Sequence, residues 1–157
     1  MTAGQTRIMG VDPGSVSAAF AVLPWDLDGG LDAAVAHAVP VADRMVDGRA
    51  FAYVVRELAP SHAAIERVGA FPGQGVSSSF RFGMGYGIIM GVLASARVEI
   101  VDVAPGVWKK HFRLDSDKEK ARALAIKRFP NVDLRLKRDA GRAEALLIAL
   151  WLRETGR

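Results

Sequence analysis

The chain has 157 residues, half of them hydrophobic, which is enough for one hydrophobic core and too few for two ordinary domains. It contains no cysteine, which excludes disulfides and thiolate metal sites, and no uncharged run reaches the roughly 18 to 20 residues of a membrane span. Residues 1–70 carry eight acids and five bases, whereas residues 107–142 carry five acids and twelve bases. We expect one soluble, intracellular domain over residues 1–157, whose basic part either binds a polyanion such as nucleic acid or is simply a solvated helical surface.

Apolar runs and helical patterns alternate in the order strand, strand, strand, helix, strand, helix, strand and three helices. Pro13-Gly14 ends the first strand, and Asp47 and Pro60 bound the first helix. In chain order, the expected strands are residues 7–11, 16–23, 35–41, 63–65 and 98–103, and the later helices are residues 79–96, 105–112, 117–129 and 139–154. The helical crossover before the fourth strand makes that strand parallel to the first. This order predicts an α/β fold with a five-stranded mixed sheet, three strands antiparallel and two parallel, and helices on both faces.

Four acidic residues stand where a catalytic site would form. Asp12 and Glu66 end two neighbouring parallel strands and should emerge at the same sheet edge, while Glu144 lies on an otherwise apolar helix that begins near Asp139. A buried acidic cluster is costly unless a cation neutralises it, and carboxylate oxygens suit Mg²⁺ or Mn²⁺. Two such ions would support phosphodiester hydrolysis, with Lys118 near the scissile phosphate. Taken singly, each acid also fits an ordinary structural role. Asp12 could be a turn residue and Glu66 an exposed strand end. Asp139 could be a helix N-cap and Glu144 a residue at the rim of its helix.

Several segments resemble the motifs of RuvC-type Holliday junction resolvases of the ribonuclease H-like superfamily. The segment 8–14 resembles their opening strand with its catalytic Asp-Pro-Gly, and Ala64-Ile65-Glu66 resembles their second motif. Asp117-Lys118, after Trp108-Lys109-Lys110, resembles their Asp-Lys segment. The resemblance extends from Arg7 to Trp151, and the order and spacing of the motifs make it specific.

The last motif, residues 139–149, departs from the usual bacterial form, in which two acids, or a histidine and an acid, stand three residues apart. Position 141 is glycine here, and the spacing of five between Asp139 and Glu144 is closer to phage RuvC-like and chloroplast resolvases. This form of the motif supports a catalytic role for Glu144 more strongly than for Asp139.

The resemblance implies a ribonuclease H-like fold and a Mg²⁺-dependent endonuclease, with Mn²⁺ as a substitute and no nucleotide cofactor. Asp12, Glu66, Asp139 and Glu144 would be the catalytic metal ligands and Lys118 the active-site lysine. The resemblance also implies a homodimer that binds a four-way DNA junction and nicks two strands symmetrically, in the cytoplasm of a bacterium or encoded by a phage.

Polar, basic and aromatic residues near the expected site are candidate DNA contacts. They are Phe71, Gln74, Ser77, Ser78, Arg81, Lys109, Lys110, Lys120, Lys137 and Arg138. Phe71 would either stack on an unpaired base or pack against the following helix. A stripe of small residues, Ser79, Gly83, Gly87 and Gly91, is either the dimer seam or the face that packs on the chain's own sheet.

Three other functions are compatible with parts of the sequence. An actin-like kinase or ATPase also places Asp-x-Gly at a first hairpin, but it needs a second domain and a second phosphate loop. A junction-binding module without cleavage would not need every acid. A nuclease for flaps, replication forks or RNA–DNA hybrids differs from a junction resolvase in substrate alone.

Overall fold

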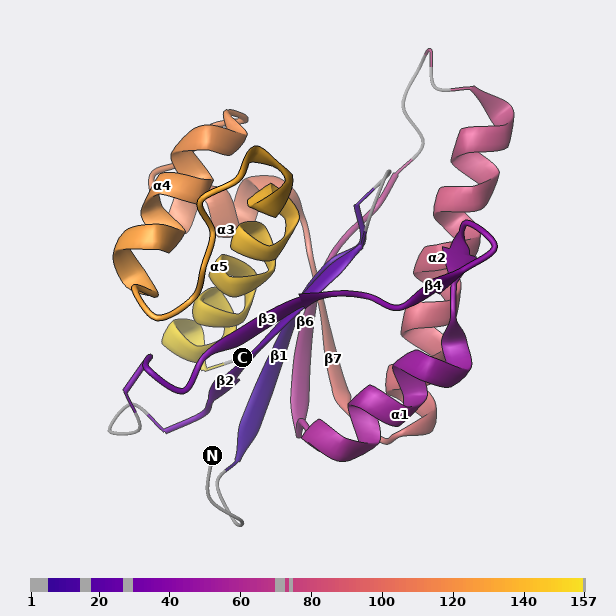
Figure 1. The fold of residues 1–157 in the computed structure, drawn as a ribbon, viewed down its shortest axis with the longest axis horizontal. Coiled ribbons are helices and arrows are strands. Elements are labelled where there is room, and N and C mark those ends of the chain that lie inside the picture. Colours follow the sequence, from indigo (N-terminus) through magenta and orange to yellow (C-terminus); the bar gives the residue numbers. More distant parts are fainter. Residues whose placement is uncertain (1–5, 15–17, 27–29, 70–72, 74, 157) are drawn as a thin grey trace.

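A five-stranded mixed sheet in the order β3-β2-β1-β6-β7 forms the centre of the molecule (Figure 1). The computed structural model describes all residues except 1–5, 15–17, 27–29, 70–72, 74 and 157. The strands are β1 (Arg7–Asp12), β2 (Ala19–Pro24), β3 (Val35–Ala38), β6 (His62–Glu66) and β7 (Glu99–Val103). The first three are antiparallel, and β6 and β7 run parallel to β1. The predicted sheet is therefore confirmed.

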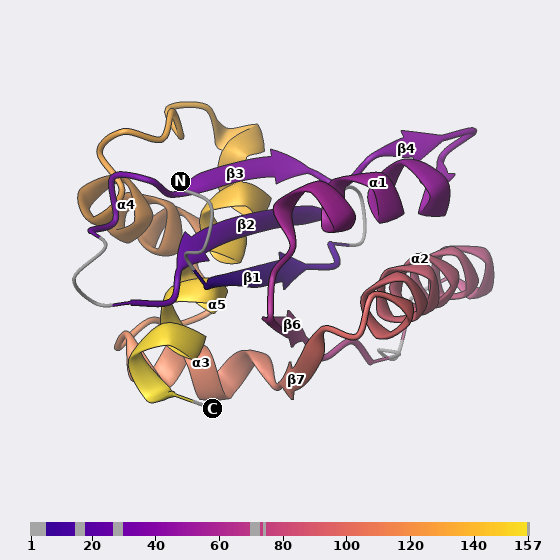
Figure 2. The ribbon, with the colours of Figure 1, turned by 90° about the horizontal axis from the view of Figure 1, so that it is seen from below.

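Helices cover both faces of this sheet (Figure 2). One face carries α1 (Gly48–Leu58) and α2 (Val76–Ser95), and the other carries α3 (Pro105–His111), α4 (Lys118–Arg128) and α5 (Ala140–Thr155). Side chains alternate along a strand, so Met9 and Val11 of β1 enter the core on the α1 and α2 side, whereas Ile8 enters the core below α5. Asp12, four residues after Ile8, is thus directed to the α5 face.

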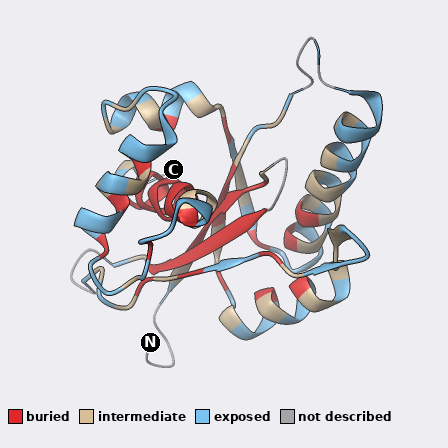
Figure 3. Ribbon diagram, turned by 45° about the horizontal axis from the view of Figure 1, so that its top comes forward, coloured by how far each residue is buried: buried red, intermediate tan, exposed pale blue. Residues whose placement is uncertain are grey.

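The close seating of α5 on β1 depends on Gly10. A Cβ atom at this position would lie 2.2 Å from the carbonyl oxygen of Ala145 and 2.4 Å from the backbone nitrogen of Ala149. Glycine thus lets the helix backbone contact the strand backbone directly. From Ala143 to Arg153 every residue of α5 is buried, which makes it the central helix of its layer (Figure 3).

The predicted helix starts are largely confirmed. The side chain of Asp47 accepts a hydrogen bond from the backbone N–H of Ala50 and caps α1, and Asp117 accepts one from the N–H of Glu119 and caps α4. The helix α2 begins at Val76 rather than at Ser79. No helix in the described part of the chain is both long and apolar enough to cross a membrane.

The expected third strand is shorter than predicted. It ends at Ala38, because Pro40 has no N–H to continue the ladder, and a small hairpin of β4 (Val41–Ala42) and β5 (Met45–Val46) follows. Its two-residue turn, Asp43-Arg44, has positive φ values of 48° and 63°. Turns of this kind usually carry Asn-Gly, so the sequence pattern did not predict the hairpin. The strand expected from residue 16 begins at Ala19, and residues 16 and 17 lie outside the described part.

Candidate active site

Asp12 is the last residue of β1, the central strand of the sheet. It pairs with Ala19 of β2, and only 5% of its surface is exposed. Its Oδ1 accepts a hydrogen bond from the backbone N–H of Gly14 at 3.0 Å, so the carboxylate also stabilises the turn after the strand. Asp12 is therefore buried at the sheet edge and also makes the turn contact that was considered as its alternative role.

Glu66 ends β6, the parallel neighbour of β1. Because Val11 lies opposite Ile65 in the register, Asp12 and Glu66 follow at the same edge of the sheet. The indole Nε1 of Trp108 donates a hydrogen bond to Oε2 of Glu66 at 2.7 Å, and Trp108 is fully buried. Helix α3 therefore fixes the orientation of this carboxylate.

Glu144 reaches the site from α5 and is only 4% exposed. Two lysines lie beside it, with Nζ of Lys109 3.2 Å from Oε1 and Nζ of Lys118 3.8 Å from Oε2. Lys109 comes from α3, and Lys118 is the first residue of α4. Lys118, the predicted active-site lysine, thus lies beside Glu144.

Burial and neighbouring charges raise the pKa values of Asp12 and Glu66. Burial raises the pKa of Asp12 to about 7, with a further rise from the charges of Glu144 and Glu66 and an opposing effect of the Gly14 N–H and Lys118. Burial also raises the pKa of Glu66, as does the charge of Glu144, while its bond from Trp108 acts against the rise. The negative charge at this edge is therefore only partly neutralised by protein groups.

The chemistry of these donors fits a hard divalent cation such as Mg²⁺ or Mn²⁺. Oε1 of Glu144 is buried without a hydrogen bond, since Lys109 is close enough for an ion pair but lies outside hydrogen-bonding geometry. Among the described residues, however, no three acidic or histidine side chains are grouped tightly enough to hold one ion in their present orientations. The structure thus brings Asp12, Glu66 and Glu144 to one sheet edge, where Glu144 raises the pKa of the other two, but among the described residues they do not form a three-ligand cage.

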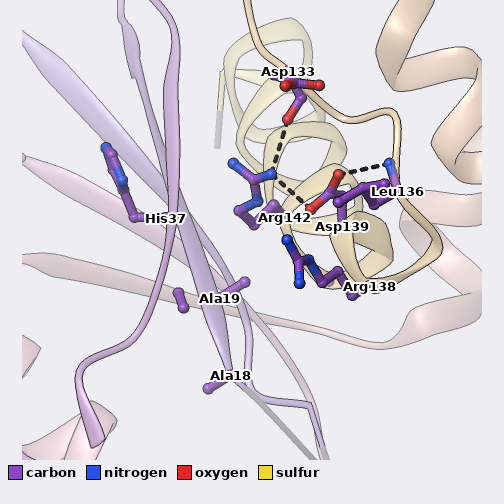
Figure 4. A pocket seen from close by; sticks show the side chains of 10 residues that line it. Ala18, Ala19, His37, Asp133, Leu136, Arg138, Asp139 and Arg142 are labelled. Carbon is purple, nitrogen blue, oxygen red and sulfur yellow. Dashed lines mark hydrogen bonds and ion pairs between the residues drawn. The ribbon is translucent and has the colours of Figure 1, made fainter.

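Asp139 does not join these carboxylates, contrary to the expectation that it is a fourth ligand. Its Oδ1 accepts a hydrogen bond from Nη2 of Arg142 at 2.7 Å, and its Oδ2 accepts one from the N–H of Leu136 at 2.9 Å (Figure 4). Burial alone would raise the pKa of Asp139, but these two donors outweigh it and lower the pKa. Asp139 lines a separate pocket with Ala19 and His37, and it makes no capping hydrogen bond to α5. The sequence pattern placed it at the helix start correctly but could not tell which way its side chain turns.

The predicted DNA contacts fall into three groups. Most are exposed: Ser77, Ser78 and Arg81 on α2, Lys110 on α3, Lys120 on α4, and Lys137 and Arg138 before α5. Lys109 differs, because its side chain is mostly buried against Glu144 and belongs to the acidic site. Phe71 and Gln74 lie outside the described residues.

Sequence reasoning missed the role of Trp108 in the site. In the sequence, Trp108 is notable only because Trp108-Lys109-Lys110 precedes the segment that resembles the Asp-Lys motif of the resolvases. The signal available was an indole N–H on a buried helix face, which requires an acceptor. Only the placement of α3 beside β6 identifies that acceptor as Glu66.

No protein-family model matches the chain, and no curated protein matches its sequence. Solved structures do share its fold. Thermus thermophilus RuvC in complex with a Holliday junction substrate superposes with a TM-score of 0.74 at 18% identity, covering 97% of this chain and 95% of that one. The fowlpox virus resolvase in complex with Holliday junction DNA gives 0.62 at 15% identity, covering 94% and 99%. The yeast mitochondrial Holliday junction resolvase gives 0.54 at 11% identity, covering 97% and 81%. The chain therefore has the ribonuclease H-like fold of these proteins.

Proposed function

We propose that this chain is a metal-dependent endonuclease that cleaves four-way DNA junctions. The main support is a set of three carboxylates, of which Asp12 and Glu144 are buried and Glu66 is partly buried, which reach one sheet edge from β1, β6 and α5. Two of the solved structures with this fold are resolvases bound to junction DNA. A resolvase needs an acidic site of this kind beside a surface that accepts a polyanion, and the exposed basic residues of α3 and α4 fit that need.

In this proposal Asp12, Glu66 and Glu144 would hold Mg²⁺, with Mn²⁺ as a substitute. When bound, the metal supplies an activated water and neutralises charge on the phosphodiester. Lys118, close to Glu144 and largely exposed, is positioned to neutralise charge that develops on the scissile phosphate. Trp108 donates its hydrogen bond to Oε2 of Glu66 and so orients that carboxylate, which leaves Oε1 as the atom that would bind the metal. Lys109 compensates the charge of buried Glu144 in the metal-free protein.

We infer that the protein acts as a homodimer through the outward face of α2. Cβ atoms added at Gly83, Gly87 and Gly91 would meet nothing within 4 Å, so this stripe does not pack on the chain's own sheet. Phe80 is 67% exposed and Met84 is 42% exposed on the same helix. Close contact with the same face of a second copy would cover these side chains and give one active site for each of two strands. We expect a dimer in sedimentation analysis.

The deciding experiment offers the purified protein an end-labelled four-way junction, a linear duplex, a flap and an RNA–DNA hybrid, with Mg²⁺ or with a chelator. We expect paired symmetric nicks in the junction, and only with metal. Cleavage of flaps or hybrids instead would identify a ribonuclease H-like nuclease with another substrate. Junction binding without any cleavage would identify a catalytically silent module.

Charge-neutral variants test the roles of the acids. We expect Asp12→Asn, Glu66→Gln and Glu144→Gln each to abolish cleavage while junction binding persists. Glu57→Gln is the matched control, because Glu57 is exposed on α1 and remote from the site. Full cleavage by any of the first three variants contradicts the assignment of that residue.

A further inference from the structure

A second feature lies next to the acidic edge, on the α2 side of the sheet. A pocket of about 360 Å³ is lined by the turn after β1, by the β4–β5 hairpin and by α2. Pro13 and Gly14, which directly follow Asp12, form one wall. Arg44 from the hairpin turn and Arg81 from α2 line the same pocket. A ligand in this pocket would thus lie beside the turn that carries Asp12.

The two arginines line one pocket because the hairpin packs closely against α2 (Figure 1). A Cβ atom at Gly85 would lie only 3.3 Å from Cγ2 of Val46, so the glycine permits this approach. Arg81 stands one helical turn before Gly85, and Arg44 stands two residues before Val46. The contact between the hairpin and α2 therefore brings both arginines to one pocket.

Arg44 occupies a backbone position that disfavours arginine. Its φ of 63° is in the left-handed region, where glycine or asparagine is usual and other L-residues are strained. Arginine at the tip of a two-residue turn thus works against local stability.

The charges in the pocket are unbalanced. Among the described residues, neither Arg44 nor Arg81 forms an ion pair, and none of the described residues that line the pocket is acidic. Asp43, in the same turn, is exposed and does not line it. Two like charges that share a pocket repel unless an anion lies between them, and guanidinium groups suit a phosphate in particular.

We propose that Arg44 and Arg81 bind a backbone phosphate of the DNA beside the Asp12 site. This inference rests on the proposed nuclease function and adds the hairpin β4–β5 as a DNA-binding element. The contact is to phosphate, so it contributes affinity and register without reading the base sequence.

The test compares two arginine-to-glycine variants with the same backbone geometry and the same loss of charge. Arg44→Gly removes the guanidinium and also relieves the strained turn, so its unfolding free energy should not fall. Arg97→Gly is the matched control, because Arg97 also has a positive φ, of 59°, is exposed, and lies beyond the other end of α2. Arg44→Lys keeps the charge without the planar guanidinium.

Binding of a labelled four-way junction is measured in EDTA over a series of salt concentrations. We expect Arg44→Gly to weaken binding about tenfold, as for loss of a charge-assisted hydrogen bond. The slope of log K against log salt should become less negative by about 0.9, as for loss of one phosphate contact. Arg81→Ala should do the same, Arg44→Lys should lose less, and Arg97→Gly should match the wild type.

Equal junction binding by Arg44→Gly and Arg97→Gly would overturn the proposal while leaving nuclease function intact, which cleavage by the wild type reports separately. If the wild type neither binds nor cleaves a junction, the proposed function and this inference both fail. Inorganic phosphate is titrated as a separate arm. Saturation of the pocket by free phosphate at low millimolar concentration, without competition against junction DNA, would assign the pocket to a small anion and overturn the proposal.

Discussion

Replacement of Asp12 by asparagine should stabilise the metal-free protein at alkaline pH. Folding raises the pKa of Asp12 from 3.8 to about 7, so the folded state binds more protons than the unfolded state between these values. The wild type should therefore lose stability as pH rises from about 4 to about 7, and the loss should then level off. At about 1.4 kcal/mol for each pKa unit, the cost of ionising Asp12 is at most about 4 kcal/mol. Asparagine avoids this cost and can still accept the hydrogen bond from the Gly14 N–H.

The assay is chemical denaturation in EDTA at pH 5 and at pH 8. We expect a higher unfolding free energy for Asp12→Asn than for the wild type at pH 8, and a difference at pH 5 that is smaller by about 2 kcal/mol or more. Glu57→Gln is at an exposed site and keeps Asp12, so its difference in stability from the wild type should be the same at both pH values. Added Mg²⁺ should stabilise the wild type and have little effect on Asp12→Asn. A variant that is less stable than the wild type at pH 8 would refute the argument that burial and the neighbouring acids strain this carboxylate.

Three further substitutions test other contacts. Trp108→Phe removes the N–H that orients Glu66 but keeps a ring in the core, so we expect cleavage to fall about 10- to 100-fold with little loss of stability, measured by single-turnover rates and thermal melting. Asp139→Asn weakens the pair with Arg142 and should cost about 1.5 to 3 kcal/mol of stability while cleavage persists; abolished cleavage in a folded variant would restore Asp139 to the metal site. Gly10→Ala places a methyl group against the α5 backbone and should cost about 3 kcal/mol or more in denaturation.

The sequence predicts the sheet and the placement of three acids of the candidate site because their signals are local. A strand that ends in Asp12 before Pro-Gly, a second strand that ends in Glu66, and a single acid on the apolar α5 are visible without tertiary information. The crossover rule then places the two strands side by side. These steps alone bring Asp12 and Glu66 to one edge.

What could not be predicted depends on side-chain direction and on contacts between distant elements. Asp139 lies one residue before α5, but its rotamer and the nearby Arg142 turn it away from the other acids. Lys109 was expected on the DNA surface, and the packing of α3 against α5 instead places it beside Glu144. The hairpin around Arg44 escaped prediction because its turn residues oppose the usual preference.

The direct backbone contact between α5 and β1 affects which amino-acid substitutions should alter the candidate active site. The interval between Asp12 and Glu144 is set by main-chain atoms of Gly10, Ala145 and Ala149, which cannot repack as side chains do. Core substitutions far from this contact should thus lower the melting temperature without altering the turnover rate at permissive temperatures. Substitutions in the outer layers of such a molecule should therefore impair its folding before they impair its catalytic rate.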